Sequence, residues 1–287
     1  MIAIFERELK SFFTGITGYI FSACILIFAG IYTMAINLSQ GYNSLDYVYG
    51  NMGFIFLLAV PILTMRTIAE ERKQKTDQLL YSLPVSMHKI VLGKYFAMLV
   101  VQAVPVIIMA FYPLIYSAFG TVAYKTSYST LFAFYLLGAA LIAMGMFISS
   151  LTDNQVVAAV LCLVVMVINY FISSLADYAS SSSASTLFVL VILAIVLAAI
   201  IWYITKNLVA ALITGIVCEA ALAITYTIIP AKFAGLLPAV IGKLSLYERF
   251  YNFTDGMFDI AAIVYFLMVS VVFVFLTVQS MEKRRWS

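Results

Sequence analysis

One acidic residue stands deep inside an apolar stretch, and it is the first candidate for chemistry in this chain. Glu219 lies in the run TGIVCEAALAI. A charge at the centre of a membrane span costs roughly 3 kcal/mol on insertion scales, so such residues often mark an ion or substrate pathway. The alternative is a protonated acid, hydrogen-bonded to a neighbouring helix with help from Thr214 or Thr225. The sequence leaves both interpretations open.

Motifs for enzymatic catalysis are missing from the sequence. The segment nearest to a nucleotide-binding loop, residues 235–244, has the wrong glycine spacing and no Ser or Thr after Lys243. It therefore lacks the phosphate cradle and the hydroxyl that binds magnesium. The single histidine, His88, has no nearby Cys or second His, which favours a solvated loop residue over a metal ligand. We expect no enzymatic activity, no metal site and no cofactor bound by this chain.

Charged residues gather in one stretch, residues 64–95, within an otherwise apolar part of the chain. The stretch holds six of the 16 basic residues. Glu71 and Lys75 stand four residues apart, which makes opposite charges neighbours on a helical surface. Lys73 and Asp77 also stand four residues apart, and Glu70 and Lys73 stand three apart, which likewise makes them neighbours. This spacing predicts a helix within residues 69–84.

The predicted helix changes character along its length. Its polar turns give way to apolar residues, among them Leu79 and Leu80. Pro84 ends it, because proline lacks the amide proton and disfavours helical geometry at the residue before it. A merely solvated loop would need none of these features. We therefore predict a short helix beside the membrane that docks on a soluble partner.

The composition identifies a polytopic membrane protein with an all-α fold. The chain is 64% hydrophobic and 10% charged, with a mean hydropathy of +1.07, whereas soluble domains are roughly half apolar and a quarter charged. At about 20 residues per span, 287 residues leave no room for a large soluble catalytic domain. The energy for any active process must then come from outside this chain. Three cysteines lie in apolar runs and predict no disulfide framework.

Apolar runs predict about eight transmembrane helices. An interfacial helix over residues 1–14 precedes them. The spans are expected at residues 16–38, around 51–64, at 90–119, 129–151 and 156–176, twice within 187–229, and at 258–278. Six spans plus a re-entrant or peripheral pair within 187–229 is the alternative. Residues 230–257 are predicted to form an external segment, and residues 1–287 a single transmembrane domain.

Proline and small residues predict irregularities in three spans. Pro61 is expected to kink the second span. Pro105 and Pro113 interrupt the third, whose thirty residues would reach about 45 Å, more than the roughly 30 Å hydrocarbon core requires. Small residues recur four apart in the fourth span and would permit close approach of helices. They are Gly138, Ala139, Ala143, Gly145 and Ser149.

The distribution of basic residues predicts the orientation. With both termini in the cytoplasm, twelve of the 16 basic residues lie on the cytoplasmic side, as the positive-inside rule demands. Lys125, Lys232, Lys243 and Arg249 would lie outside.

The charged stretch resembles the first cytoplasmic segment of type 2 ABC transporter permeases, especially the branch related to gliding-motility permeases. Shared features are an acidic-acidic-arginine start, a threonine-acidic pair, a leucine pair, a proline and an Ile-Val-x-Gly-Lys entry to the next span. In this chain they are Glu70, Glu71, Arg72, Thr76, Asp77, Leu79, Leu80, Pro84, Ile90, Val91, Gly93 and Lys94. Asp77 stands where glutamate is more usual, and Gln74 and Lys75 where Ser-Gly is common.

The carboxy-terminal stretch is similar to the ending of the same branch. The matching residues are Phe250, Gly256, Asp259, Tyr265, Lys283, Arg284, Arg285 and Trp286. The resemblance therefore covers both ends of the chain. Its motifs are specific for the family and carry no information on the substrate.

The resemblance implies a complex in which this chain is the permease subunit. Residues 69–84 would form a coupling helix in a groove of a separate ABC ATPase subunit, and residues 1–14 an interfacial connecting helix. Two ATPase copies would bind ATP and magnesium, and a second permease, the same chain or a different one, would complete the transport route. Membrane lipid surrounds the complex, no nucleic acid is expected, and a bacterial plasma membrane is the expected location.

The leading hypothesis is an ATP-driven exporter. The coupling helix would convert closure of the ATPase dimer into movement of the second and third spans. Polar contacts are assigned to Glu70, Glu71, Arg72, Thr76 and Asp77, anchoring to Leu79 and Leu80, and the exit angle to Pro84. The alternatives are an ion-coupled secondary transporter that uses Glu219, and a non-transporting membrane scaffold. The halves of the chain show no convincing repeat, a feature that would favour the secondary transporter.

Overall fold

The computed structural model describes residues 1–42, 44–76, 85–118, 120–178, 186–188, 190–191, 219–220, 225–226 and 242–285. The chain forms two compact units, one of Met1–Tyr170 with Leu246–Ser287 and the other of Phe171–Ser245. Most of the second unit lies outside the described residues, including nearly all of 187–229, where two further spans are predicted. The fold and the site below belong to the first unit.

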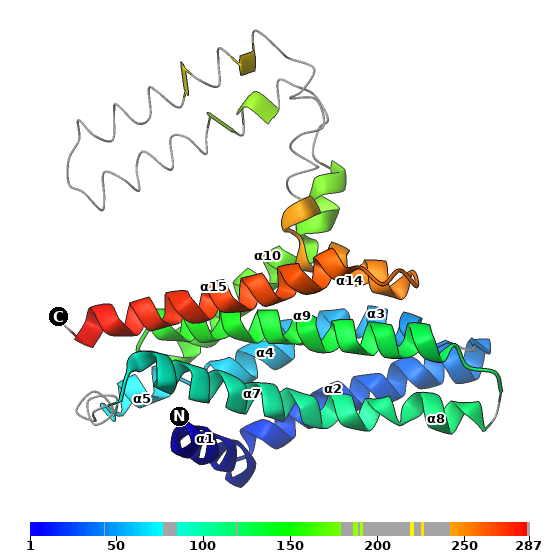
Figure 1. The fold of residues 1–287 in the computed structure, drawn as a ribbon, viewed down its shortest axis with the longest axis horizontal. Coiled ribbons are helices and arrows are strands. Elements are labelled where there is room, and N and C mark those ends of the chain that lie inside the picture. The colour runs from blue at the N-terminus through cyan, green and yellow to red at the C-terminus, as the bar shows by residue number, and fades with distance from the viewer. Residues whose placement is uncertain are drawn as a thin grey trace. The chain divides into compact units, whose positions relative to one another are not determined.

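All regular elements in the described part of the chain are helices, which confirms the predicted fold class (Figure 1). The α-helices are α1 (Ile2–Thr14), α2 (Thr17–Tyr32), α3 (Asp46–Met52), α4 (Phe56–Thr64), α5 (Ala69–Lys73), α7 (Met87–Ala110), α8 (Tyr112–Ser117), α9 (Tyr124–Leu151), α10 (Gln155–Tyr178), α14 (Leu246–Thr254) and α15 (Ile260–Arg285). A π-helix, η1 (Thr33–Leu38), continues α2, and a 3-10 turn, η2 (Gly53–Ile55), joins α3 to α4.

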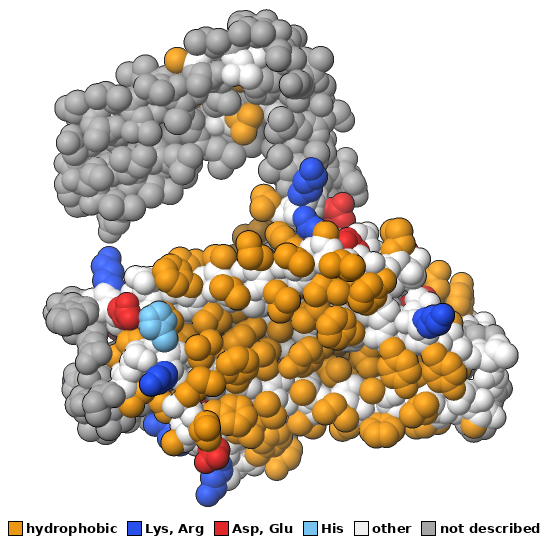
Figure 2. Space-filling view, in the orientation of Figure 1, with side chains coloured by type: hydrophobic (Ala, Val, Ile, Leu, Met, Phe, Trp, Pro, Cys, Tyr) orange, Lys and Arg blue, Asp and Glu red, His pale blue; other side chains and the backbone are white. Residues whose placement is uncertain are grey.

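Six helical stretches in the described ranges are long and apolar enough to cross a membrane. They are Thr17–Leu38, Asp46–Lys73, Met87–Ser117, Tyr124–Leu151, Gln155–Ile172 and Ile260–Arg284. Figure 2 shows hydrophobic side chains over the middle of one face and charged side chains towards its two ends. The chain is a multi-pass membrane protein, and these six stretches match six of the predicted spans.

Several helices begin earlier than predicted. The second span starts at Asp46, five residues before its predicted start at residue 51. Val48 and Tyr49 are fully buried there, and this packing overrides the turn-forming composition. Likewise α9 starts at Tyr124, five residues before the predicted start at residue 129, and Lys125 lies in its first turn. Tertiary contacts commonly extend helices beyond the limits that local sequence suggests.

The long third span is divided near its second proline. Helix α7 continues through Pro105 and ends at Ala110, and α8 follows with Pro113 in its first turn. Proline is well tolerated there, because the amide protons of a first turn have no partner within the helix. The predicted interruption is confirmed beside Pro113, where the two helices meet at Phe111, but it is wrong at Pro105.

Helix α9 is the centre of the bundle and packs against α4, α7, α14 and α15. Figure 1 shows it running between α7 and α15. A Cβ atom added at Gly145 would lie 2.5 Å from Oγ1 of the buried Thr64, so the absence of a side chain lets α4 approach. At Gly138 a Cβ atom would collide with the Gln102 side chain of α7. The predicted role of small residues in this span is confirmed at both glycines.

Candidate functional site

A buried lysine organises one end of the bundle. Lys94 lies in the second turn of α7 and its side chain is 1% exposed. Its Nζ atom is 3.0 Å from Oε1 of Glu8 and 2.8 Å from Oε1 of Glu71, and it donates a 3.0 Å hydrogen bond to the carbonyl oxygen of Thr67. A buried ammonium requires such partners, because an unpaired charge is strongly disfavoured away from water. Lys94 thus joins α1, α7 and the segment that ends the second span.

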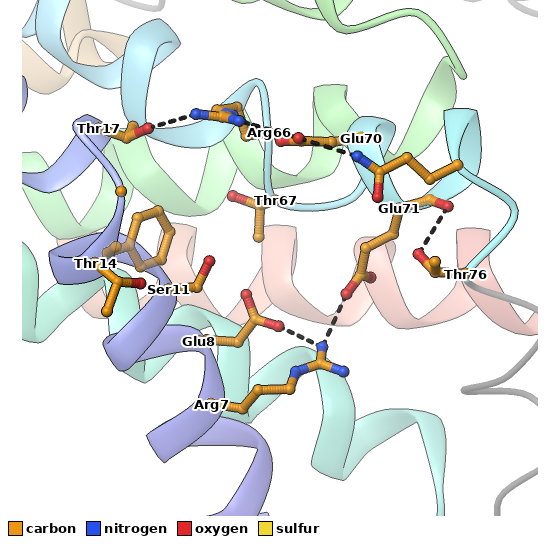
Figure 3. Close-up of a pocket in the computed structure, with 13 residues that line it drawn as sticks. Arg7, Glu8, Ser11, Thr14, Thr17, Arg66, Thr67, Glu70, Glu71 and Thr76 are labelled. Atoms are coloured by element: carbon orange, nitrogen blue, oxygen red, sulfur yellow. Dashed lines mark hydrogen bonds and ion pairs between the residues drawn. The ribbon is translucent and has the colours of Figure 1, made fainter.

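Arg7 completes a cluster of two cations and two carboxylates. Its Nη2 atom is 2.5 Å from Oε1 of Glu8 and 2.9 Å from Oε1 of Glu71 (Figure 3). Burial of the Glu8 carboxyl opposes its ionisation, but the charges of Lys94 and Arg7 outweigh this effect and lower the pKa of Glu8. The hydrogen bond to Glu8 raises the pKa of Arg7 in turn. Glu8 and Arg7 are therefore both ionised near neutral pH.

Arg66 forms a second link on the same side. Its guanidinium contacts the Glu70 carboxylate at 2.6 and 3.0 Å, and its Nη1 atom donates a 3.0 Å hydrogen bond to Oγ1 of Thr17, at the start of α2. Glu70 thus pairs one turn backwards with Arg66, whereas local spacing predicts a pair with Lys73. A two-pronged Arg–carboxylate contact is more directional than a contact with a lysine.

Arg72 faces the interior of the bundle. Its side chain is 2% exposed, and Nη1 donates a hydrogen bond to the carbonyl oxygen of Ser150, at the end of α9. The Asp153 carboxylate lies 3.8 Å from Nη1 and also 2.5 Å from Nη1 of Arg284 in α15. These contacts join α5 to the α9–α10 turn and to the last helix. Residues 152–154, the short connection between α9 and α10, thus provide one of the anchors of α5.

The first turn of α5 is capped from another helix. No side chain of its own caps α5. Oγ of Ser149, in α9, instead accepts hydrogen bonds from the backbone amides of Ile68 and Ala69 at 3.3 and 3.1 Å. Capping oxygens satisfy amide protons that a helix start leaves without a partner. The direction of α5 is thereby fixed by α9.

Helix α5 is shorter than predicted. It ends at Lys73, residues 74–76 form a turn, and Lys75 has a φ of 56°. The amide of Thr76 donates a 2.9 Å hydrogen bond to the carbonyl oxygen of Glu71, a closure typical of helix ends with one left-handed residue. The prediction of an unbroken helix is therefore wrong at residues 74–76, and the predicted pair of Glu71 with Lys75 is replaced by Lys94 and Arg7.

A polar cavity of about 550 Å³ separates α1 from the segment around α5. Its walls carry Arg7 and Glu8 from α1 together with Arg66, Glu70 and Glu71 from the end of the second span (Figure 3). Hydroxyl groups complete the lining, from Ser11, Thr14, Thr17, Thr67 and Thr76. The cavity has the volume to admit side chains of a second protein, and it offers both donors and acceptors.

The structure brings part of the predicted site together. Glu70 and Glu71 border the polar cavity, Thr76 lines its edge, and Arg72 is buried behind it. Asp77, Leu79, Leu80 and Pro84 lie outside the described residues. Glu219 falls in the described pair 219–220, where it is helical and exposed, and most of its surroundings lie outside the described part.

Sequence reasoning missed the partners that come from distant parts of the chain. Arg7 and Glu8 lie in a helix that was expected only to rest on the membrane, and Asp153 in a turn. One signal was available: Lys94 stands at the entry to an apolar run. A lysine at such a place needs a carboxylate nearby, and Glu8 and Glu71 are the two that the fold supplies.

The fold and the charged end together define a multi-pass helical membrane protein whose polar groups gather beside the end of its second span. Residues 33–229 match the family model described as ABC-2 family transporter protein. This match covers more than half of the chain, so the chain belongs to the ABC-2 transporter family. No curated protein and no solved structure matches it.

Family membership has two direct consequences. The chain is a membrane permease subunit of a family that carries no ATPase domain itself, and an ATPase partner is implied. The resemblance to type 2 ABC permeases is thereby confirmed at the level of the family.

Proposed function

We propose that this chain is the permease of an ATP-driven exporter in the gliding-motility-permease-like branch, and that α1 and residues 69–84 dock on the ATPase. In this proposal the end of the bundle with the charged cluster faces the cytoplasm, with both termini. Figure 1 supports this arrangement, because the N-terminus, the end of α15 and α5 lie at the same end of the first unit. Two ATPase copies and a second permease would complete the complex.

The observation that carries the proposal is the buried contact of Lys94 with Glu8 and Glu71. Separating these groups would leave charges buried without partners, which typically costs about 3–5 kcal/mol. The first helix, the segment that bears α5 and the start of α7 are therefore expected to move as one body. Movement of residues 69–84 on the ATPase would therefore be transmitted directly to the second and third spans.

The contacts of Arg72 extend this body across the bundle. Because Arg72 contacts Ser150 and approaches Asp153, α5 is also tied to the end of the fourth span. Asp153 in turn holds Arg284 of the last helix. We assign Arg72 a positioning role rather than a contact with the ATPase, because its side chain is buried.

The surface left for the partner is polar and accessible. Lys73, Gln74 and Lys75 are exposed at the end of α5, and the side chain of Arg7 is half exposed at the mouth of the polar cavity. Leu79 and Leu80 follow in the sequence and are proposed as the apolar anchors. A central apolar contact with a polar rim is the usual composition of a protein interface.

The test is a mild-detergent pull-down of the tagged chain, followed by an ATP hydrolysis assay on the eluate. The wild-type chain should retain an ATPase in equal amounts. The double variant Leu79→Asp, Leu80→Asp should insert into the membrane normally and lose the ATPase. A matched control is Ser117→Asp, Ala118→Asp, an exposed pair at the other end of the bundle, which should keep it. Retention of the ATPase by the Leu79 and Leu80 variant would overturn the docking assignment.

Transport is tested separately from docking. In reconstituted vesicles, ATP-dependent movement of substrate away from the side that carries the ATPase would support an exporter. Movement towards that side would contradict it. The mass of the purified complex would establish whether two permeases and two ATPases are present.

A further inference from the structure

A second region with unexplained polar chemistry lies at the end of the bundle away from α5. Here the π-helix η1 continues α2 for six residues, Thr33–Leu38. Single π turns within longer helices are uncommon and are frequent at functional sites. Thr33 and Asn37 of this segment are buried, whereas Met34 and Leu38 are exposed. The segment therefore presents both a polar inner side and an apolar outer side.

The side chain of Asn37 is only partly satisfied. It is 7% exposed, and its Nδ2 atom donates hydrogen bonds to the carbonyl oxygens of Tyr42 and Ser44 at 2.7 and 3.0 Å. Both partners can only accept, so the orientation of the amide is unambiguous. Oδ1 is buried and accepts no hydrogen bond from the described residues. A buried acceptor without a donor is costly, and it calls for an explanation such as a bound ligand.

Two cavities meet beside Asn37. An apolar groove of about 420 Å³ lies between α2 with η1 and α8, and its walls include Met34, Leu38 and Ile115. A smaller cavity of about 220 Å³ is lined by Asn37 and Tyr42. Leu38 and Tyr116 line both cavities, so the groove and the smaller cavity are neighbours. A single elongated molecule could occupy the two together.

The chemistry of the lining selects the occupant. Met34, Leu38 and Ile115 are more than half exposed, and they lie in membrane-spanning stretches, so the groove opens towards lipid acyl chains. No charged side chain lines either cavity among the described residues, which disfavours a group recognised by charge alone. Oδ1 of Asn37 requires a donor, and the hydroxyls of Tyr42 and Tyr116 can donate to phosphate oxygens.

We propose that this composite cavity binds one phospholipid of the surrounding bilayer whose head group carries an N–H donor, as an ethanolamine phospholipid does. Its acyl chain lies in the groove between η1 and α8, and its ammonium donates to Oδ1 of Asn37. A choline phospholipid has the same phosphate and the same chains but no N–H group. The site therefore distinguishes the two lipids by one hydrogen bond.

The experiment uses an ethanolamine phospholipid with a photoactivatable diazirine on its acyl chain and the corresponding choline phospholipid. Each is added to vesicles that contain the full-length chain, and cross-linked peptides are mapped by mass spectrometry. Labelling of residues 30–38 and 112–116 should be about two- to tenfold stronger with the ethanolamine lipid, the ratio expected for one hydrogen bond. Equal labelling by the two lipids would overturn the proposal.

Two variants make the test specific. Asn37→Ala should abolish the preference for the ethanolamine lipid, and Leu38→Trp should reduce labelling by both lipids, because an indole fills the junction of the two cavities. Leu38 is exposed, so this variant tests the proposal even where Asn37→Ala disturbs the fold. The matched control is Ile31→Trp, an exposed residue of α2 that lines neither cavity. Equal labelling in the Leu38 and Ile31 variants would show ordinary bilayer contact and contradict a defined site.

Discussion

The two ends of the first unit are held together by different chemistry. At the end that carries α5, buried ion pairs join the elements, with Lys94 and Arg72 at their centres. At the other end, neutral groups join α3, α7, α9 and α14. The Tyr49 hydroxyl donates to the carbonyl oxygen of Met109 at 3.1 Å, and the Thr130 hydroxyl lies 2.9 Å from the carbonyl oxygen of Phe253.

This difference determines how each end responds to change. Removing one partner of a buried ion pair strongly destabilises the fold, because the other charge stays buried and uncompensated. A neutral hydrogen bond can be removed at a cost of about 0.5–1.5 kcal/mol. We therefore expect single substitutions at the charged end to reduce stability strongly, and single substitutions at the neutral end to reduce it only slightly.

The largest effect is expected from Lys94→Met. It removes the cation between Glu8 and Glu71, and we expect a loss of about 3–5 kcal/mol of stability. The measurement is the fraction of purified protein that stays monodisperse after heating. Lys89→Met is the matched control, because Lys89 is exposed on the same helix. Equal heat stability of the two variants would contradict a central role for the buried ion pairs.

A smaller loss is expected from Arg72→Met. The Ser150 carbonyl still accepts a 3.2 Å hydrogen bond from the Ser280 hydroxyl, and Asp153 keeps Arg284, so the change is less severe than loss of Lys94. A hydrogen bond from a charged group contributes about 1.5–3 kcal/mol. The same heating assay measures it, and Lys73→Met is the exposed neighbouring control. In the ATPase complex, Arg72→Met should also uncouple ATP hydrolysis from transport while the ATPase stays bound.

Gly145→Ala serves as a comparison, because it changes stability without altering the ion pairs of Lys94 or the contacts of Arg72. Its new methyl group would press on Thr64, whose short buried side chain is bonded to its own helix. Overpacking of this kind costs about 1–3 kcal/mol. Gly30→Ala, where nothing lies within 4 Å of the added carbon, should leave heat stability unchanged. A destabilised Gly145→Ala variant that keeps its coupling ratio would separate stability from coupling.

A mild effect is expected from Tyr49→Phe at the neutral end. The variant loses one hydrogen bond to Met109 and keeps the packed ring, which predicts a loss of about 0.5–1.5 kcal/mol. Tyr47→Phe, at an exposed position of the same helix, serves as the control. If Tyr49→Phe proved as damaging as Lys94→Met, the contrast between the two ends would be lost.

The smallest effect concerns pH. Because the pKa of Glu8 is below its usual value of 4.5, its ionised form stabilises the fold above that pH, and the contribution is lost as the pH falls through the lowered pKa. Heat stability of the wild type should therefore decrease between neutral pH and pH values below about 4.5. Glu8→Gln should lose this part of the pH dependence. An identical pH profile in the two proteins would show that Glu8 contributes nothing to it.

The sequence predicts the helices better than it predicts their connections. Apolar runs located the six described spans, and the break near Pro113 followed from the properties of proline. The start of α3 at Asp46 and the early end of α5 were missed. Burial of Val48 and Tyr49 extends α3 back to Asp46, and the left-handed conformation of Lys75 ends α5 early. Neither cause is visible in local propensity.

For the candidate site, the residues were recognised but their partners were not. Glu71 and Arg72 were expected to face outward to another protein, yet they contact Lys94 and the Ser150 carbonyl. Helical spacing predicts only pairs within one helix. Arg7 lies 64 residues from Glu71 in the chain, so their ion pair depends on the packing of whole helices.

The cap that Ser149 places on α5 has a consequence for the order of synthesis. The amide of Ala69 and the hydroxyl that accepts its hydrogen bond are 80 residues apart. While the ribosome is still making the third span, Ser149 has not been synthesised, and the amides at the start of α5 lack this acceptor. This cap on the segment proposed to bind the ATPase can therefore form only after Ser149 of the fourth span has been synthesised.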